Sequence, residues 1–395
     1  MRTNNQPPRT PMHFKAKIHS KMPQQGLSIF AVMTGLANEH GAINLSQGFP
    51  DFDCHPELVE LVHKYMREGF NQYAPMPGVP VLREALAAKM ERDYGVLYNP
   101  DTEITITSGA TEALYAAITA VVQPGDEVIV FEPYYDVYVP VIQYSGGVPV
   151  YVQLKLPDYH IDWQEVKDKL TDKTRAIILN NPHNPGTSVF TEEDIGRLGE
   201  IVRGNDLILI SDEVYEHIVF DEGRHLSLAA YPHLAERSMV ISSFGKTFHT
   251  TGWKMGWCAA PQELTAELRK IHQFITYSVN TPIQYAFAEF LERRDLIYGL
   301  KDFYQHKRNF FVNLLEATPF KIVPARGTYF QLAEFSAVSD EKELDFVKRL
   351  TVEYGVAAIP LSAFYHKNDD HGIIRFCFAK KEETLEQAVE RLCRI

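Results

Sequence analysis

Cysteines and long apolar runs are both scarce in this sequence. The four cysteines lie far apart and form no C-x-x-C pair, so neither a disulfide framework nor a metal site is indicated. No apolar run approaches the roughly 20 residues that cross a bilayer, and the start of the chain lacks the apolar centre of a secretory signal. We therefore expect a cytoplasmic protein with no membrane partner.

Positive charge is also in short supply, because the chain has a net charge of -12 and a pI near 5.7. A nucleic-acid or anionic-membrane surface needs a basic face, so small molecules are the expected partners. The exception is residues 1–28, which contain five Lys or Arg and no acid. We interpret them as a loose N-terminal arm, with a transit segment as the alternative.

The chain has enough hydrophobic residues to form a large core, since they make up 45% of its 395 residues. From residue 103 to 260, short β-rich runs alternate with helical stretches, which is typical of a mostly parallel sheet covered on both faces. We predict an α/β domain whose seven strands are Glu103–Thr107, Glu127–Phe131, Val148–Leu154, Arg175–Asn180, Leu207–Ser211, Ser238–Ser242 and Met255–Ala260.

The pattern changes on either side of this region. Upstream, residues 56–68 and 79–94 have helical spacing of apolar positions. Downstream, a charged helix begins at residue 292, and the elements that follow suit a small α+β domain. We expect strands at 320–323, 328–332, 356–360 and 373–376, and helices at 341–354 and 381–393.

One lysine, Lys246, stands among small and hydroxylated residues directly after a strand-like run, in S-S-F-G-K-T-F-H-T-T-G-W-K-M-G-W. We interpret it as the covalent anchor of a cofactor aldehyde. Such a bond forms only with a deprotonated amine, and the neighbouring cation Lys254 would lower the lysine pKa. The run Gly245-Lys246-Thr247 mimics the end of a nucleotide-binding phosphate loop, but that motif needs a glycine where this chain has Val240.

Several other segments place polar groups at strand ends. In T-S-G-A-T-E-A-L, a glycine turn opens a helix whose first free N–H groups favour an anion. In S-D-E-V-Y, the carboxylate of Asp212 comes just past an apolar strand and the phenol of Tyr215 follows three residues later. Arg375 stands in an apolar strand and needs an anionic partner if it is buried. The structural alternatives are helix caps for the first two segments and a salt bridge for Arg375.

Turns rich in aromatic, proline or glycine residues form a further group. Tyr135 follows a strand in F-E-P-Y-Y-D-V-Y, and Tyr73 lies in the irregular loop N-Q-Y-A-P-M-P-G. Asn184 lies in N-N-P-H-N-P-G-T, and Gly48 lies in G-A-I-N-L-S-Q-G-F-P-D-F. Taken singly, each has an ordinary structural interpretation: the two tyrosines pack against neighbouring residues, the Asn-Pro pair forms a turn, and the glycine turn connects two elements.

In their order, from about residue 40 to 378, these segments resemble the class I and II aminotransferases, which are fold-type I enzymes that use pyridoxal 5'-phosphate. The closest likeness is to kynurenine and glutamine transaminases and bacterial methionine aminotransferases. The resemblance implies a large domain at 59–291, a small domain made of 29–58 and 292–395, and a homodimer. It also implies that the cofactor is bound by Gly109, Ala110, Thr111, Tyr135, Asn184, Asp212, Tyr215, Ser243, Lys246, Lys254 and, from the second subunit, Tyr73.

Within that set, the resemblance implies that Lys246, Asp212 and Tyr215 are catalytic. Lys246 carries a proton, Asp212 pairs with the pyridine nitrogen, and Tyr215 bonds the ring oxygen. The substrate carboxylate is implied to bind Arg375, with Gly48 and Asn184 beside it. The family signature continues Thr-Gly where this chain has Gly186-Thr187, which leaves the shape of that loop open.

The function that follows is transamination of an amino acid with a 2-oxo acid as acceptor. No arginine lies near Leu27–Phe30 or Phe49 to take a distal carboxylate, so apolar, sulfur-containing or aromatic donors are expected, with methionine favoured. Phe49, Tyr135, Tyr277 and Phe364 are candidates for the pocket wall. The alternatives are a cysteine-S-conjugate or other C–S β-lyase, and an aspartate or broad-range aminotransferase. A DNA-binding regulator is not expected, because residues 1–28 are too short for the extra domain.

Overall fold

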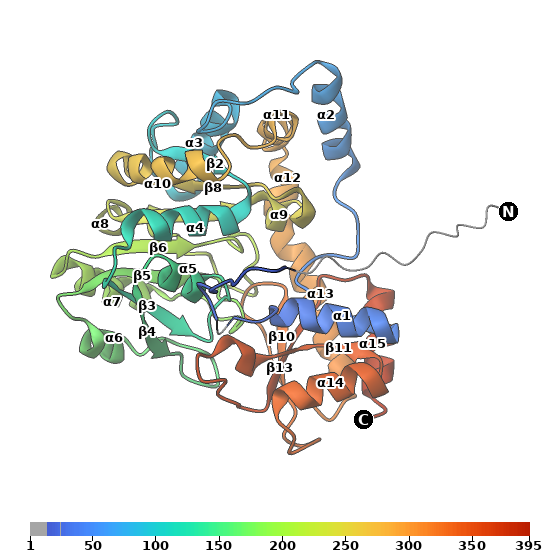
Figure 1. The fold of residues 1–395 in the computed structure, drawn as a ribbon. Coiled ribbons are helices and arrows are strands. Elements are labelled where there is room, and N and C mark those ends of the chain that lie inside the picture. The colour runs from blue at the N-terminus through green and yellow to red at the C-terminus, as the bar shows by residue number, and fades with distance from the viewer. Residues whose placement is uncertain (1–13, 24) are drawn as a thin grey trace.

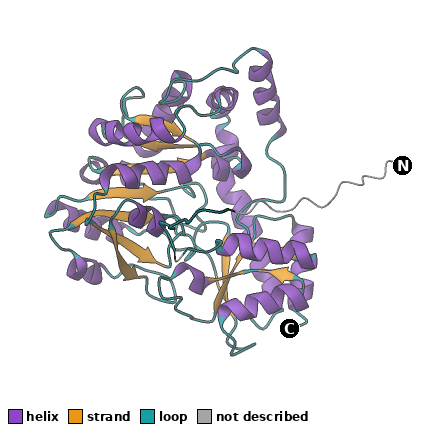
Figure 2. Cartoon of the chain, viewed as in Figure 1, coloured by secondary structure: helices purple, strands orange, loops and turns teal. Residues whose placement is uncertain are grey.

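The computed structural model describes residues 14–23 and 25–395, so much of the expected N-terminal arm lies outside the described residues. The described chain folds as a large α/β body around one seven-stranded sheet and a smaller body that contains two shorter sheets (Figure 1). Loops gather between the two bodies, where the strands of the large sheet end (Figure 2). Among residues 14–23 and 25–395, no helix is long and apolar enough to cross a membrane.

The large sheet has the seven strands that the sequence predicts, and their order is β2-β8-β7-β6-β5-β3-β4. Only β8 runs antiparallel to its neighbours, so the predicted fold is confirmed. The strands are β2 (Ile104–Thr107), β3 (Glu127–Glu132), β4 (Val148–Gln153), β5 (Thr174–Asn180), β6 (Ile208–Asp212), β7 (Ser238–Ser243) and β8 (Gly256–Ala259).

Both faces of the large sheet are buried, because alternate residues of a strand point to opposite sides. On β5, Ile177 and Leu179 belong to one apolar core, whereas Ala176 and Ile178 belong to another. The covering helices are α3 (Pro80–Tyr94), α4 (Gly109–Val121), α5 (Tyr138–Tyr144), α6 (Trp163–Lys169), α7 (Glu192–Arg203), α8 (Pro232–Ala235) and α10 (Gln262–Ile275). A further helix, α11 (Thr281–Phe290), packs against α3.

The small body contains two sheets, and the strand predicted at 356–360 is divided between them. β11 (Val356–Ala357) pairs in parallel with β1 (Ile43–Asn44), whereas β12 (Ile359–Pro360) pairs with β13 (Ile373–Cys377). β13 also pairs with β10 (Phe330–Glu334), which pairs with β9 (Lys321–Val323). The helices here are α1 (Ile29–His40), α12 (Arg294–Tyr298), α13 (Leu300–Leu315), α14 (Glu343–Glu353) and α15 (Glu382–Leu392).

One expected helix is broken in the structure. The charged segment that starts at 292 forms α12 and α13, which are separated at Gly299. A Cβ at position 299 would lie 2.8 Å from the carbonyl oxygen of Asp295, so the chain passes too close to itself for a larger residue. Gly299 itself keeps near-helical dihedrals, with φ -70° and ψ -11°, so the interruption is confined to this one residue.

The pairing of β1 with β11 joins an N-terminal segment to the C-terminal third of the chain. This pairing supports our proposal that residues 29–58 and 292–395 form one domain and 59–291 the other. The proposed boundary at 58 falls inside α2 (Pro56–Arg67), and Lys64 and Tyr65 of α2 bond Glu289 of α11 at 2.8 and 2.7 Å. We therefore propose that the chain enters the large domain just before Pro56.

Candidate active site

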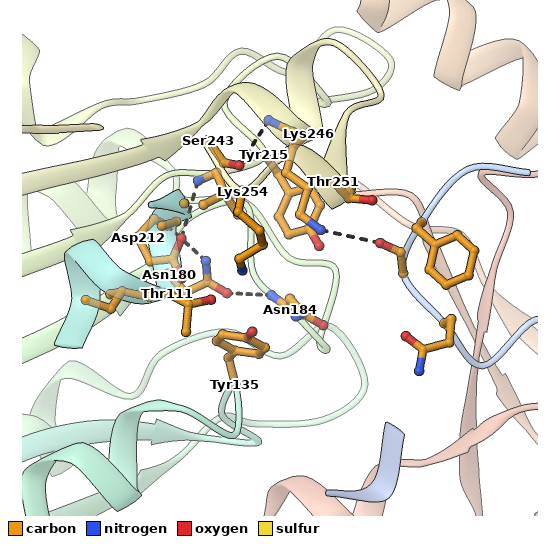
Figure 3. Close-up of a pocket in the computed structure, with 18 of the residues that line it drawn as sticks. Thr111, Tyr135, Asn180, Asn184, Asp212, Tyr215, Ser243, Lys246, Thr251 and Lys254 are labelled. Atoms are coloured by element: carbon orange, nitrogen blue, oxygen red, sulfur yellow. Dashed lines mark hydrogen bonds between the residues drawn. The ribbon is translucent and has the colours of Figure 1, made fainter. Parts of the chain in front are cut away.

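A pocket of about 280 Å³ lies where the large sheet faces the small body (Figure 3). The register of the parallel strands brings its polar groups together, since Asn180 at the end of β5 lies beside Asp212 at the end of β6. Of the candidates for the pocket wall, Phe49 and Tyr135 line this pocket, whereas Tyr277 and Phe364 do not. The residues predicted to bind the cofactor or the substrate carboxylate all line it, except Tyr73. They are Gly48, Gly109, Ala110, Thr111, Tyr135, Asn184, Asp212, Tyr215, Ser243, Lys246, Lys254 and Arg375.

Lys246 lies on the short helix α9 (Phe244–Thr247), directly after β7, and Figure 3 shows its amine directed toward the small body. Its Nζ donates to the hydroxyl of Tyr329 at 2.7 Å and lies 3.4 Å from the carbonyl oxygen of Gly48. Burial lowers the pKa of Lys246 to about 8, and Lys254 adds a smaller effect in the same direction. The effect expected from Lys254 is therefore present, but burial contributes more, because removing the charged amine from water is unfavourable.

The start of α4 offers free N–H groups to an anion. The residue before it, Ser108, makes no side-chain cap, and its own N–H donates to Glu112 at 2.9 Å. The backbone of Gly109 has a φ of +77°, and a Cβ there would come within 3.4 Å of Lys254 Nζ. No carboxylate within the described chain pairs with Lys254, and Ser243 lies on the same side of the pocket. This is the arrangement that binds a phosphate group.

Asp212 lies at the back of the pocket and is buried. Its Oδ2 accepts a hydrogen bond of 2.6 Å from the hydroxyl of Tyr138, on α5. Burial raises the pKa of Asp212 to about 6, although Tyr138 and Lys246 oppose the shift. A cation bound next to this carboxylate would compensate for its lost hydration. Tyr138 was missed in the sequence, where only its position three residues after Tyr135 could have indicated it.

Arg375 comes from β13 and reaches the pocket from the opposite side. Its Nη1 donates to Asn184 Oδ1 at 2.6 Å and its Nη2 to the carbonyl oxygen of Ser46 at 3.3 Å. The guanidinium lies 3.8 Å from the centre of the Phe330 ring, and its Nε is buried without a hydrogen-bond partner. Burial lowers its pKa to about 10, so it stays charged at neutral pH. No salt bridge to a described carboxylate was found, which leaves the charge available to a ligand.

Two tyrosines, Tyr135 and Tyr215, belong to the pocket wall, and a third, Tyr329, contacts Lys246 without being one of the lining residues. Tyr135 lies across the pocket from the lysine in Figure 3, on the segment after β3. The ring of Tyr215 lies 5.5 Å from Lys246 Nζ, and burial raises the pKa of its phenol well above the usual range. Tyr329 packs edge-on against Tyr215 with their ring centres 5.2 Å apart. Tyr329 was also missed, because it appeared in the sequence only as part of a strand.

Tyr73 is the predicted cofactor-binding residue that does not line the pocket, and 84% of it is exposed. Its loop is nevertheless held firmly by the α10–α11 region. Ser278 donates to the carbonyl oxygen of Ala74 at 3.0 Å, Thr281 to that of Gln72 at 2.6 Å, and His272 bonds that of Met76 at 3.0 Å. A large aromatic side chain is thus presented to solvent from a fixed backbone.

The reversed pair Gly186-Thr187 has a clear role in the structure. Thr187 takes a φ of +60°, the left-handed conformation that a glycine adopts more readily. At position 186 a Cβ would lie 2.7 Å from His183 Nδ1 and 2.9 Å from Cγ of Tyr159. The carbonyl oxygen of Thr187 accepts bonds from the N–H groups of Arg326 and Gly327, which hold the loop in place.

The fold and this pocket are those of a transaminase, and the comparisons agree. The chain matches the model of the family Aminotransferase class I and II over residues 40–392, and it belongs to that family. The enzymes of this family depend on pyridoxal 5'-phosphate, so the predicted activity class and cofactor are confirmed.

Individual relatives are similar over almost their whole length. Methionine aminotransferase of Escherichia coli is 52% identical, over 94% of this chain and 97% of that protein. A probable N-succinyldiaminopimelate aminotransferase of Mycobacterium tuberculosis is 38% identical over the same shares. The crystal structure of an E. coli protein identified as having a methionine aminotransferase function superposes with a TM-score of 0.94 at 50% identity, covering 96% of this chain and all of that one.

The residues of the pocket fit pyridoxal 5'-phosphate. The uncapped start of α4 and the ammonium of Lys254 suit its phosphate, and the buried carboxylate of Asp212 suits a protonated ring nitrogen. The flat ring of Tyr135 suits the pyridine face. The amine of Lys246, whose pKa is already lowered, suits the aldehyde.

Proposed function

We propose that this aminotransferase takes amino acids with apolar, sulfur-containing or aromatic side chains, with methionine favoured, and a 2-oxo acid as acceptor. The observation that carries the proposal is the distribution of charge in the pocket. Its described cations are Lys246, Lys254 and Arg375. The first two lie where the cofactor is expected, so one cation is left, and it matches the single α-carboxylate of an apolar amino acid.

The rest of the substrate side of the pocket is mostly apolar, and the amide of its polar residue, Gln47, already bonds the carbonyl oxygen of Phe30 and the hydroxyl of Thr34. Phe30, Phe49 and Phe330 line this side. Lys380 Nζ bonds the carbonyl oxygen of Phe49 at 2.8 Å and lies 4.6 Å from the centre of that ring, but Lys380 is not one of the lining residues. Sulfur and aromatic groups gain about 0.3–1.5 kcal/mol from each contact with such a ring. The similarity to E. coli methionine aminotransferase also supports a sulfur-containing donor.

In this proposal Arg375 binds the substrate carboxylate through its two Nη atoms. Asn184 and the Gly48 turn lie beside it, so the carboxylate would be held between the two bodies of the molecule. The planar guanidinium fixes the orientation of the carboxylate, and therefore also the direction of the Cα–H bond. With substrate bound, the aromatic rings that line the pocket would limit the access of water to this region.

When bound, pyridoxal 5'-phosphate supplies an electron sink for the charge that develops at the substrate Cα. Lys246 would remove the proton from Cα and return a proton elsewhere, since a pKa of about 8 allows the amine to act in both directions near neutral pH. Asp212 would hold the ring nitrogen protonated, and Tyr138 keeps that carboxylate in place. Asn184 and Tyr215 would bond the ring oxygen, and Gly109, Ala110, Thr111, Ser243 and Lys254 the phosphate.

We further propose a homodimer in which Tyr73 completes the phosphate site of the second subunit. Its 84% exposure on a firmly held loop supports a role outside its own pocket. A cytoplasmic location is proposed as well, and the free state of Cys54, Cys258, Cys377 and Cys393 is consistent with a reducing compartment.

The experiment that tests the substrate proposal is a panel of amino donors with one 2-oxo acid as acceptor, compared by kcat/KM. Methionine and aromatic donors should be preferred. If aspartate exceeds them tenfold, which is about 1.4 kcal/mol of transition-state binding, the apolar pocket does not set the specificity. Pyruvate released from a cysteine conjugate without any acceptor would indicate β-elimination instead.

A further inference from the structure

The hydroxyl of Tyr329 joins three parts of the chain that are far apart in sequence. Tyr329 lies just before β10 and is fully buried. Its hydroxyl is bonded to Lys246 Nζ at 2.7 Å and to the carbonyl oxygen of Gly48. It is the closest hydrogen-bonding group to the lysine amine among the described residues, because Gly48 itself lies at 3.4 Å.

The chemistry of the three groups fixes the direction of these bonds. A carbonyl oxygen can only accept, so the single phenolic proton of Tyr329 must be donated to Gly48. The phenolic oxygen then presents only lone pairs to Lys246, and the lysine must be the donor. Burial raises the pKa of Tyr329 well above its usual range, which keeps that proton in place.

This arrangement has a consequence for a neutral lysine. A neutral amine has two N–H bonds and one lone pair, and one N–H is used by the bond to Tyr329. The lone pair must therefore point away from Tyr329. The rings of Tyr329 and Tyr215 lie 5.3 and 5.5 Å from Nζ and limit where else the amine can turn.

We propose that Tyr329 is a positioning residue for Lys246, which orients the lone pair of the amine through its hydroxyl and stabilises the ammonium form. The proposal rests on the proposed role of Lys246. By bonding Gly48 at the same time, Tyr329 also links the lysine to the turn that lies beside the substrate carboxylate. The hydroxyl carries this role, because the ring packs against Tyr215, Tyr304 and Phe330 whether or not it has an oxygen.

The test compares Tyr329→Phe with Tyr304→Phe. Tyr304 is equally buried, its ring lies 5.7 Å from that of Tyr329, and its hydroxyl has no hydrogen-bond partner in the described chain. The two substitutions therefore remove the same atom from neighbouring rings, and only one of them touches Lys246.

Two properties are measured, both starting from cofactor-free protein. The first is the pKa of Lys246, followed by NMR of ¹³C-methylated lysines and assigned with Lys246→Ala. The second is the rate at which added pyridoxal 5'-phosphate is captured, followed by absorbance. In Tyr329→Phe the pKa should fall by roughly one pH unit, because the charged amine loses an acceptor. Capture, measured where the amine is neutral, should slow about tenfold because the lone pair is no longer oriented. Tyr304→Phe should leave both unchanged.

A pKa and a capture rate that are the same in Tyr329→Phe as in the wild type would overturn the proposal. If Tyr329→Phe does not fold, 3-fluorotyrosine at position 329 keeps the hydroxyl but makes it a poorer acceptor, and a Lys246 pKa that does not fall would then be the contrary result. The proposed function fails separately, through sustained transamination by Lys246→Ala.

Discussion

Arg375 and Asn184 are 191 residues apart in the sequence, yet the guanidinium of one donates to the amide oxygen of the other at 2.6 Å. The bond connects β13 of the small body to the loop after β5 of the large sheet. It occupies one Nη atom, while Nη2 makes a longer bond and Nε has no partner among the described residues. The arginine is thus held in place while much of its hydrogen-bonding capacity remains free for a ligand.

The first prediction follows from that geometry. Arg375→Lys keeps a positive charge but loses the planar pair of N–H donors. The substrate carboxylate would then bind a single ammonium group instead of two parallel N–H groups. We expect kcat/KM for the best donor to fall by about two orders of magnitude, mostly through KM. Steady-state kinetics with varied donor measures the effect.

Arg308→Lys is the matched control. Arg308 is also buried, but it bonds Asp221 at 2.6 and 3.0 Å and does not line the pocket. This variant should unfold at lower temperature while its KM stays near the wild-type value. If the two variants raise KM equally, Arg375 does not act through direct contact with the substrate.

The second prediction concerns pH and the stability of the cofactor-free protein. The pKa of Lys246 is about 8 in the folded state, whereas an unfolded lysine has a pKa of about 10.4. Below pH 8 the amine is charged in both states, and burying that charge destabilises the fold. As the pH rises from 8 to about 10.4, the folded state loses its proton first and the penalty disappears.

Lys246→Met should therefore unfold with a free energy about 2 kcal/mol larger than that of the wild type at pH 7, after allowance for the partial exposure of the lysine. Near pH 10.5 the two proteins should be equal. Urea unfolding at both pH values measures this difference. Lys270→Met, on the exposed face of α10, is the control for replacing a lysine by a methionine at a site without a buried charge. A difference between the Lys246→Met variant and the wild type that does not change with pH would contradict the assigned pKa.

The third prediction tests the second subunit. Tyr73→Phe leaves Lys246 intact, and Lys246→Ala leaves Tyr73 intact, so a mixed dimer contains one site with both wild-type groups. Random reassociation makes half the dimers mixed, which should restore about a quarter of wild-type activity. The measurement is activity before and after the two inactive or weakened proteins are unfolded and refolded together. An active monomer in sedimentation would rule out the shared site.

The fourth prediction separates the two residues of the reversed signature. Gly186→Ala places a Cβ against His183 and Tyr159 and should destabilise the protein by about 1–3 kcal/mol. Thr187→Gly removes the strain of a positive φ but also increases the conformational entropy of the unfolded chain. These two effects oppose each other, so the free energy of unfolding should change by no more than about 1 kcal/mol. Thermal unfolding compares them, and an alanine tolerated at 186 without loss would mean that the loop is looser than the structure indicates.

Much of the fold was determined by local sequence pattern. The seven strands of the large sheet were found because each is a short β-rich run bounded by helical stretches. Apolar residues on one face of a strand or helix recur at a regular spacing, and this spacing can be recognised without knowing which element packs against that face. The starts of α2 and α3 and the irregular loop between them were found in the same way. The site residues at strand ends were proposed because their motifs occur in the order of a known family.

The tertiary structure decided the strand pairings, side-chain contacts and pKa shifts that depend on segments brought together only in the folded chain. Residues 356–360 read as one strand, but β11 and β12 have different partners, β1 and β13, and sequence does not show which strand will be adjacent. Tyr138 and Tyr329 gained their contacts with Asp212 and Lys246 from elements 74 and 83 residues away. The lowered pKa of Lys246 has the same origin: the nearby cation was visible in the sequence, but the main cause is burial, which the packing of the whole chain around the amine creates.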